Sequence, residues 1–504
     1  MMNNYNSVAV GTICFASAAA LAVYLGANVS VWLCALFFVL TIITFLLKLK
    51  IRCASALFLV FLFLFSGSSY FVIYDHFSES AIKNKFENTT HNTEFIITEK
   101  RENNSFNIYT CAANVKDNAN NAYNVKFNIY SNTKIDADCY DKLSGDITFS
   151  PLKDNEYYNY NRSCGVFLDA SLKGDRIIKK CGDTVNLNKI ILLLRDKTRD
   201  ALHKNMRPDR SQVLSALLTG DTYNLSGDLK NTFSDLSVYH MLVISGFHTS
   251  IIGFMLYEAL SLIFGRKSKI AAVLSCLFLF MFAIFAGFSP SVIRSVIMSS
   301  FFVFSSTIRR YHSGVTSMGL AAFIMTVFNP YNALNIGFLL SFLSVFGVIV
   351  IFPKLYGLIS FQFLRWKPIK LFLDYVYKSI CVTFSATVST LPITIIVFKK
   401  ISPYLLISNL VMLPFVELAV VAGVITAALS LVFPGAFVTS ALFSSESFII
   451  KLLLDIANGI KALPVSTFRF NNDYEITVFF TVCVVLISPF VYLKFKQWKN
   501  NIIT

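Results

Sequence analysis

The sequence predicts a mainly α-helical, polytopic membrane protein with a small β-rich domain inserted outside the cytoplasm. Three observations lead to this prediction: the composition, the spacing of apolar runs and one long polar interruption. Of the 504 residues, 55% are hydrophobic and 14% are charged, whereas soluble proteins average about 25% charged residues. The mean hydropathy is +0.60. Because so few charged groups cannot cover a water-soluble core, lipid must be the solvent for much of the chain.

Three apolar runs open the chain, at 8–25, 31–47 and 53–74. Each is close to the ~20 residues that a spanning helix needs. The first run lacks the positively charged flank of a cleavable signal peptide, and a second run follows at once. The turn between the second and third runs is rich in Lys and Arg, which places it in the cytoplasm. Segment 1–77 is therefore predicted to form the N-terminal membrane helices and to leave the membrane on the outer side.

Residues 78–185 differ abruptly in composition, with many Asn, Asp, Lys and Tyr residues and a period of two. Short strands bounded by turn residues are typical of a small barrel or sandwich. An extracytoplasmic β-rich domain is therefore predicted here. The expected strands are Glu94–Glu99, Ser105–Ala113, Tyr123–Tyr130 and Gly145–Leu152.

Four of the ten cysteines lie in this region, and an oxidising compartment allows up to two disulfides. Three pairings of four cysteines exist, and the spacing does not choose among them. The candidates are Cys111, Cys139, Cys164 and Cys181. A cluster of tyrosines and basic residues is either a surface that stacks single strands or an ordinary loop. It comprises Lys153, Tyr157, Tyr158, Tyr160 and Arg162.

Segment 186–236 returns to a helical period. Its first part, Asn188–Asn205, sets apolar residues opposite Lys and Arg, which is typical of a helix in the membrane interface. Two short helices are expected on either side of the Gly220-Asp221 break. Segment 237–499 is then predicted to form the main membrane domain. Its candidate spans are 238–264, 270–288, 291–308, 315–328, 334–352, 379–398, 404–433 and 474–493.

The topology of 404–463 stays open. If 404–433 crosses the membrane inward, then 437–463 must cross outward for the C-terminal tail to lie in the cytoplasm. The charged residues within 437–463 favour an interfacial or pore-lining helix instead. A re-entrant piece at Pro403–Pro414 is a third alternative.

The net charge is +15, from 44 Lys and Arg against 29 Asp and Glu. This excess suits anionic lipid headgroups and nucleic acid alike, because cytoplasmic loops of any membrane protein carry excess Lys and Arg. Charge alone therefore does not identify the partner.

Ionisable residues inside apolar runs are the first candidates for function, because a charge at membrane depth is costly and faces a cavity or a partner. His240 and His248 lie in the run 238–264, and Arg294 lies four residues after Pro290. The two histidines differ by about 80° on a helix, unlike the i,i+4 pair of a zinc helix. No cysteine or carboxylate stands beside them, so no metal is expected.

A nucleophile–base pair is the rival interpretation of the same segment. Ser245 and His248 share a helix face, and Asp221 is a candidate to orient the imidazole. The combination would suit an intramembrane hydrolase or an enzyme of envelope polymers. Helix packing around Ser245-Gly246 is the structural alternative. The sequence has no Walker loop and no dinucleotide fingerprint, so no cofactor is expected.

Six segments in a fixed order together resemble the ComEC-type competence channel family. They are Leu217–Asp221, His240–His248, Ala286–Arg294, Asn335–Phe342, Ser389–Pro392 and Ile407–Pro414. The β-rich region at 78–185 is likewise similar to the OB-like domain of that family. Many members add a C-terminal metallo-β-lactamase-like nuclease domain. This chain ends shortly after its last apolar run without a His cluster, so a short form that is not an enzyme is expected.

The resemblance implies an inner-membrane channel that carries one strand of transforming DNA into the cytoplasm. Its implied partners are single-stranded DNA, membrane lipid and a separate DNA receptor, nuclease and cytoplasmic motor. A homo-oligomer is possible under this resemblance. Transport of another anionic polymer stays open as an alternative function. Arg294, His240 and His248 are assigned to the permeation path or its gate, because a phosphodiester strand needs donors and positive potential. The implied core residues are Gly220, Asp221, His240, Ser245, Gly246, His248, Ser291, Arg294, Pro392, Asn409 and Pro414.

Overall fold

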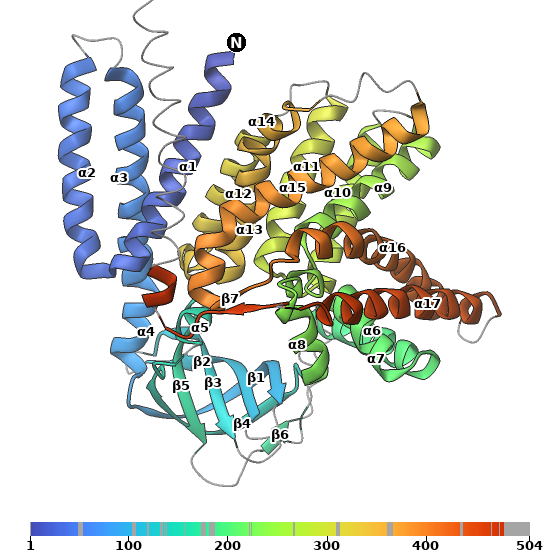
Figure 1. Ribbon diagram of the computed structural model, residues 1–504. Helices are drawn as coiled ribbons and strands as arrows, with labels where there is room; N and C mark the ends of the chain where they lie inside the picture. The colour runs from blue at the N-terminus through green and yellow to red at the C-terminus, as the bar shows by residue number, and fades with distance from the viewer. Residues whose placement is uncertain are drawn as a thin grey trace, which may run out of the picture.

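Helices dominate the computed structural model of the chain (Figure 1). By length and composition, eight helices among the described residues suit a membrane span. This confirms the mainly α-helical, multi-pass membrane class. The predicted run 474–493 lies almost wholly outside the described part. The structure describes residues 2–48, 54–102, 107–117, 120–131, 135, 137, 139–155, 157–172, 178–180, 187–220, 222, 224–265, 268–308, 313–359, 366–433, 437–464, 466–472 and 474–477.

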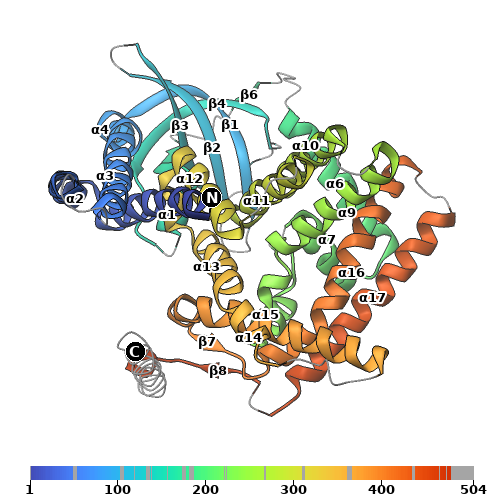
Figure 2. The same ribbon diagram turned by 90° about the horizontal axis from the view of Figure 1, so that it is seen from above.

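Three N-terminal helices, α1 (Met2–Leu25), α2 (Ala27–Lys48) and α3 (Ala54–Phe77), stand side by side (Figures 1 and 2). Their apolar residues are spread round each helix, as expected where lipid or protein meets every side. Gly26 has a φ of 80° and forms the one-residue turn between α1 and α2, a conformation that costs glycine little. Ser30 Oγ closes this turn by donating to a carbonyl of α1 at 2.8 Å.

The domain inserted after α3, here called the outer domain after its predicted side, contains a closed ring of five strands. A short helix, α4 (Glu79–Phe86), leads into it. The strands pair in the order β1-β2-β3-β5-β4, and β4 pairs back to β1. Only the β3–β5 pair in this ring is parallel. They are β1 (Thr90–Glu102), β2 (Asn107–Lys116), β3 (Ala122–Ser131), β4 (Lys142–Pro151) and β5 (Val166–Leu172), with β6 (Ile178–Lys180) beside β4.

The four predicted strands correspond to β1–β4, and the sequence pattern misses β5. Aromatic rings fill the centre of the strand ring: the Phe127 centroid lies 6.1 Å from that of Phe95 and 5.2 Å from that of Phe149. Cys111 is fully buried in the same core, and burial together with the Cys139 thiol raises its pKa. Between two described cysteines the structure shows no disulfide, and Cys181 lies outside the described residues. The disulfides and the OB-like assignment stay predictions.

Three helices follow the outer domain: α6 (Leu187–Asn205), α7 (Pro208–Thr219) and α8 (Gly227–Asp235). They fall where the sequence predicts amphipathic and short helices. On α6, Ile191 is buried against the protein while Leu193 is exposed, so apolar surface remains free for lipid. These three helices connect the outer domain to the main helical bundle.

The predicted span 238–264 coincides with a candidate span at Tyr239–Phe264, but this segment is not one continuous helix. A short 3₁₀ turn, η1 (Tyr239–Met241), is followed by a break, and α9 (Gly246–Phe264) begins only after Ser245. The remaining elements of the bundle overlap the predicted apolar runs. They are α10 (Lys269–Phe285), α11 (Pro290–Thr307), α12 (Gly314–Phe328), η2 (Pro330–Leu334), α13 (Ile336–Val350), α14 (Phe352–Tyr356) and α15 (Lys367–Phe398).

A helical hairpin, α16 (Leu405–Val432) and α17 (Phe437–Lys461), lies crosswise to α2 and α3 (Figures 1 and 2). Its two ends are joined, because β7 (Lys400–Ile401) pairs antiparallel with β8 (Phe468–Arg469). The chain therefore enters and leaves the hairpin at one point. The topology of 404–463 relative to the membrane stays a prediction.

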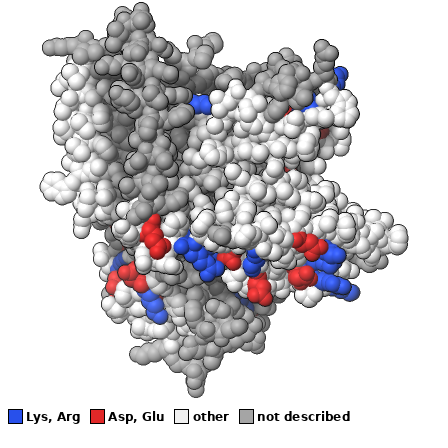
Figure 3. Space-filling model, in the orientation of Figure 1, with Lys and Arg blue, Asp and Glu red and all other residues white. Residues whose placement is uncertain are grey.

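Charged residues on the visible face lie mainly in a band at the level of α17 and of the junction with the outer domain (Figure 3). The helix bundle above this band presents mostly uncharged surface in the same view. Uncharged helices bordered by charged groups are expected where a bundle meets lipid and then water. The division into 1–77, 78–185, 186–236 and 237–499 stays a prediction.

Candidate functional site

The site begins at the break before α9, where Ser245 caps the helix. Ser245 Oγ accepts a hydrogen bond from the backbone N–H of His248 at 3.2 Å, and His248 Nδ1 accepts from the N–H of Ser245 at 3.5 Å. This reciprocal arrangement is a capping box, which satisfies free backbone donors at a helix start. It favours the structural interpretation of the pair, because the imidazole faces a backbone N–H and not the hydroxyl. Asp221, the third member of the hydrolase hypothesis, lies outside the described residues.

Gly246 brings the start of α9 into close contact with α11. Its N–H donates to Ser291 Oγ at 2.9 Å, and its carbonyl accepts from the hydroxyl of Ser295. A Cβ at this position would overlap Nη2 of Arg294 and would lie 3.1 Å from the carbonyl oxygen of Ser291. Only glycine, which has no Cβ, leaves room for this contact. The start of α9 and the Arg294 guanidinium therefore pack directly against each other.

Arg294 is the charged group of the site and is only 7% exposed. Its Nε donates to Ser341 Oγ of α13 at 2.8 Å, and Nη1 lies 3.6 Å from the sulfur of Met298. The Phe342 ring lies 5.9 Å from the guanidinium carbon. Among the described residues no carboxylate forms an ion pair with it. A buried cation without a counter-ion is costly and favours an anionic partner.

Serine hydroxyls continue from this arginine along the α9–α11 contact. Ser250 Oγ lies 2.6 Å from Ser295 Oγ and accepts from Ser299 at 3.2 Å. Beside them is a pocket of about 260 Å³. The pocket is lined by Ser250, Phe254, Met298, Ser299, Phe302 and Val303. The line of hydroxyls gives polar character to a helix contact within the bundle.

Gly220 ends α7 next to the same site. Its φ is 74°, and a Cβ there would lie 3.5 Å from the carbonyl oxygen of Ala286 and 3.6 Å from Ile244 Cδ1. Arg195 of α6 donates from Nη2 to the carbonyl of Thr219 at 2.6 Å, which fixes α6 to this turn. The structure therefore brings together motif segments that lie about 70 residues apart in the chain.

Among the described residues, the contacts of Arg294 are with Ser341, Met298 and Phe342, and none is with the remaining predicted site residues. His240 is exposed in η1, and Pro392 is exposed on α15. Pro414 lies inside α16, and on the same helix Asn409 is buried with an Oδ1 that has no hydrogen-bond partner. No group of three His, Cys, Asp or Glu side chains suited to a metal occurs in the part of the chain that the structure describes. The roles of these residues in transport stay predictions.

Sequence reasoning missed several members of the site. Ser341 lies in a quoted motif, but nothing in that motif marks it as the partner of Arg294. A signal was present on α11, where Ser291, Ser295 and Ser299 recur every four residues and so share one face. In a lipid-embedded helix such a polar stripe indicates a helix contact or a polar path.

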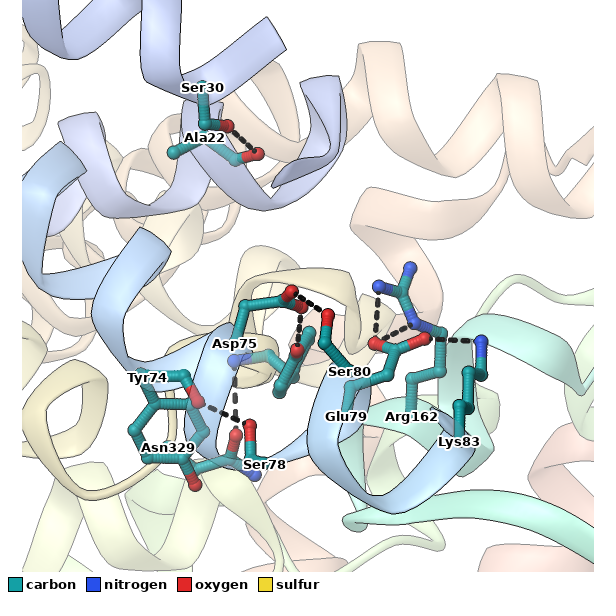
Figure 4. Close-up of polar contacts among 11 residues, drawn as sticks. Ala22, Ser30, Tyr74, Asp75, Ser78, Glu79, Ser80, Lys83, Arg162 and Asn329 are labelled. Atoms are coloured by element: carbon teal, nitrogen blue, oxygen red, sulfur yellow. Dashed lines mark hydrogen bonds and ion pairs between the residues drawn. The ribbon is translucent and has the colours of Figure 1, made fainter. Parts of the chain in front are cut away.

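A second polar cluster joins the outer domain to the membrane helices (Figure 4). Glu79 of α4 is buried and pairs with Lys83 Nζ at 2.6 Å and with Arg162 Nη2 at 2.7 Å. Arg162 also lies 5.1 Å from the ring of Tyr331 in η2, and Tyr331 donates to Asp75. Burial alone would lower the pKa of Arg162, and the Glu79 carboxylate raises it above its ordinary value.

This cluster changes the interpretation of the predicted tyrosine surface. Arg162 belongs to α5 (Tyr158–Ser163), and its Nε and Nη2 donate to the Glu79 carboxylate of α4. Tyr158 lies 5.6 Å from the same guanidinium carbon. Arg162 is therefore part of an internal junction and is not a free element of a stacking surface for single strands.

The fold and site define a polytopic membrane protein whose broken helices surround a buried guanidinium. A family model described as Competence protein matches residues 217–496, more than half of the chain. The chain belongs to this Competence protein family. The matched region includes α9, α11 and α13, which build the Arg294 site. With its eight long apolar helices, this membership identifies a multi-pass protein of the inner membrane.

Two curated relatives share this region. ComE operon protein 3 of Bacillus subtilis is 25% identical over 311 residues, covering 62% of this chain and 38% of the relative. Recombination protein 2 of Haemophilus influenzae is 23% identical over 267 residues, covering 51% of this chain and 32% of the relative. Each alignment therefore spans less than half of the relative's length. No solved structure matches the chain.

Proposed function

We propose that the protein is the channel through which one strand of DNA crosses the inner membrane during natural competence. Membership of the Competence protein family supports this function, as do relatives named for a competence operon and for recombination. The observation that carries the proposal is Arg294, a buried guanidinium with no carboxylate partner among the described residues. A phosphodiester strand supplies one anionic group per nucleotide, which is the partner that this cation lacks.

In this proposal the strand meets Arg294 and the adjacent hydroxyls of α9 and α11 one phosphate at a time. Arginine suits phosphate because its planar fork donates two parallel hydrogen bonds. Hydroxyls give weaker contacts that release the strand, as transport requires. We propose that the DNA receptor, the nuclease that yields the single strand and the cytoplasmic motor are separate polypeptides.

The rival function is a hydrolase that uses Ser245 and His248. The capping geometry supports it poorly, since the Ser245 hydroxyl accepts from backbone and shows no bond to the imidazole. Purified protein supplied with Mg²⁺, Mn²⁺ or Zn²⁺ is expected to leave single- and double-stranded DNA intact. Metal-dependent cleavage that disappears in a His248 variant would support the rival function.

The direct test of the proposed function is a clean deletion assayed with labelled double-stranded DNA. We expect label to reach the outer compartment as in the wild type and to be absent from the cytoplasm. Complementation with the full chain should restore cytoplasmic label. A deletion strain that internalises DNA normally would overturn the proposed function.

A further inference from the structure

The outer domain contacts the membrane helices through Ser163, the last residue of α5. Its carbonyl accepts a hydrogen bond from Asn329 Nδ2 at 2.7 Å, and its hydroxyl oxygen accepts from Asn335 Nδ2 at 3.2 Å. The same hydroxyl donates to the carbonyl of Tyr160 at 2.6 Å. Ser163 is 5% exposed, so water does not compete freely for these bonds. Two asparagines that flank η2 therefore hold the end of α5.

Asn335 makes this contact with one end of its amide and caps α13 with the other. Its Oδ1 accepts from the backbone N–H of Gly337 at 2.8 Å and of Phe338 at 3.3 Å. Asparagine is among the best N-cap residues because its side chain replaces the missing backbone acceptors. A single side-chain amide thus links the outer domain to the first turn of α13.

The helix that Asn335 caps also carries the partner of the buried arginine. Ser341 lies six residues after the cap, about 9 Å along the helix axis, and accepts from Arg294 Nε at 2.8 Å. Ser341 is buried as well. A helix is stiff over this distance, so a displacement at the cap is passed to Ser341 and to the guanidinium that it orients.

We propose that Asn335 is a positioning residue for strand transport. It fixes α13 to Ser163 of the outer domain and thereby sets the orientation of Arg294. This inference rests on the proposed function, and it adds that the outer domain acts on the membrane site through Asn335. The role is distinct from helix capping, because capping uses Oδ1 while the contact with the outer domain uses Nδ2.

Two substitutions in the full-length protein separate these roles. Asn335→Asp keeps an oxygen that caps α13 but removes the donor to Ser163, whose hydroxyl hydrogen is already directed to Tyr160. Ser163→Ala removes the acceptor and leaves the cap intact. Ser344→Ala is the matched control, because within the described part of the chain the Ser344 hydroxyl donates to the carbonyl of Ser341 of the same helix and to no other element.

We expect Asn335→Asp and Ser163→Ala each to lower cytoplasmic arrival of labelled DNA by about five- to tenfold, at wild-type protein levels. The double variant should be no worse than either single variant, and Ser344→Ala should match the wild type. Wild-type transport by both single variants would show that Asn335 acts as a helix cap alone and would overturn the inference.

A second readout separates failure of this inference from failure of the proposed function. In purified full-length protein, Ser163→Ala should speed amide hydrogen exchange over residues 336–342, whatever the protein transports. Unchanged exchange over this segment would overturn the positioning role even if the deletion strain fails to take up DNA. Faster exchange together with normal uptake in the deletion strain would instead overturn the proposed function.

Discussion

Arg294 Nε donates to Ser341 Oγ at 2.8 Å, and both side chains are buried between α11 and α13. The bond joins two segments of the Competence protein region that lie 47 residues apart. Among the described residues, the other hydrogen bond of this guanidinium runs from Nη1 to the sulfur of Met298. A neutral hydroxyl orients the cation without neutralising it, so the positive potential stays available to an anion.

The space around Gly246 provides the first prediction. Gly246→Ala places a methyl group against Arg294 Nη2 and the Ser291 carbonyl, and it should displace the guanidinium at a cost of about 1–3 kcal/mol. We expect DNA uptake to fall sharply while the protein still accumulates in the membrane. The control is Gly459→Ala, because this glycine also lies in a helix and a Cβ there meets nothing within 4 Å. Equal uptake in the two variants would contradict close packing at Gly246.

The second prediction separates capping from catalysis at Ser245. Ser245→Ala loses the cap and should lower stability by about 1 kcal/mol. Ser245→Asn keeps a capping oxygen but has no hydroxyl nucleophile, so a channel should retain near-wild-type uptake with it. A hydrolase would lose all activity in both variants. Thermal unfolding of the purified variants, measured alongside uptake, distinguishes the two outcomes.

The third prediction concerns the junction between Glu79 and Arg162. Glu79→Gln leaves Arg162 buried without its counter-charge and should destabilise the protein by about 3 kcal/mol or more. Arg162→Met should cost less, because Lys83 Nζ still pairs with Glu79 at 2.6 Å. The double variant should be less destabilised than the sum of the two. A double-mutant cycle by thermal unfolding measures this coupling. Additive effects would show that the ion pair contributes nothing to the junction.

The fourth prediction is a pH dependence at Asp169 in β5. Burial raises the pKa of Asp169, and one carboxylate oxygen has no hydrogen-bond partner while the other accepts from the Lys153 N–H at 2.9 Å. Because the folded-state pKa is the higher one, ionisation opposes folding, and the stability of the outer domain falls as the pH rises through that pKa. Asp169→Asn should therefore stabilise the protein by about 1 kcal/mol at pH 8. It should not stabilise the protein at a pH below the pKa that the Asp169 carboxyl has in the unfolded chain. Equal effects at both pH values would contradict this assignment.

Composition and apolar period predict most of the helices and four of the five strands of the ring because those signals are local. The relationships that build the sites are not local. Glu79 and Arg162 come from different elements, and neither neighbourhood in the sequence indicates the other. The break before α9 could have been predicted, since Ser245 and His248 have capping-box spacing, although His is not the usual third residue. The pairing of β7 with β8 depends on two dipeptides that no periodicity reveals.

The central claim, that Arg294 contacts the transported strand, is tested most directly by scoring labelled DNA in the cytoplasm of Arg294→Leu and Arg294→Lys strains. Arg294→Leu should lose cytoplasmic label while outer label and protein level stay at wild-type values. Arg294→Lys keeps the charge but not the planar fork, and should be intermediate, with a loss of about ten- to a hundredfold. Cytoplasmic label in Arg294→Leu that falls only in proportion to the amount of protein would contradict the claim.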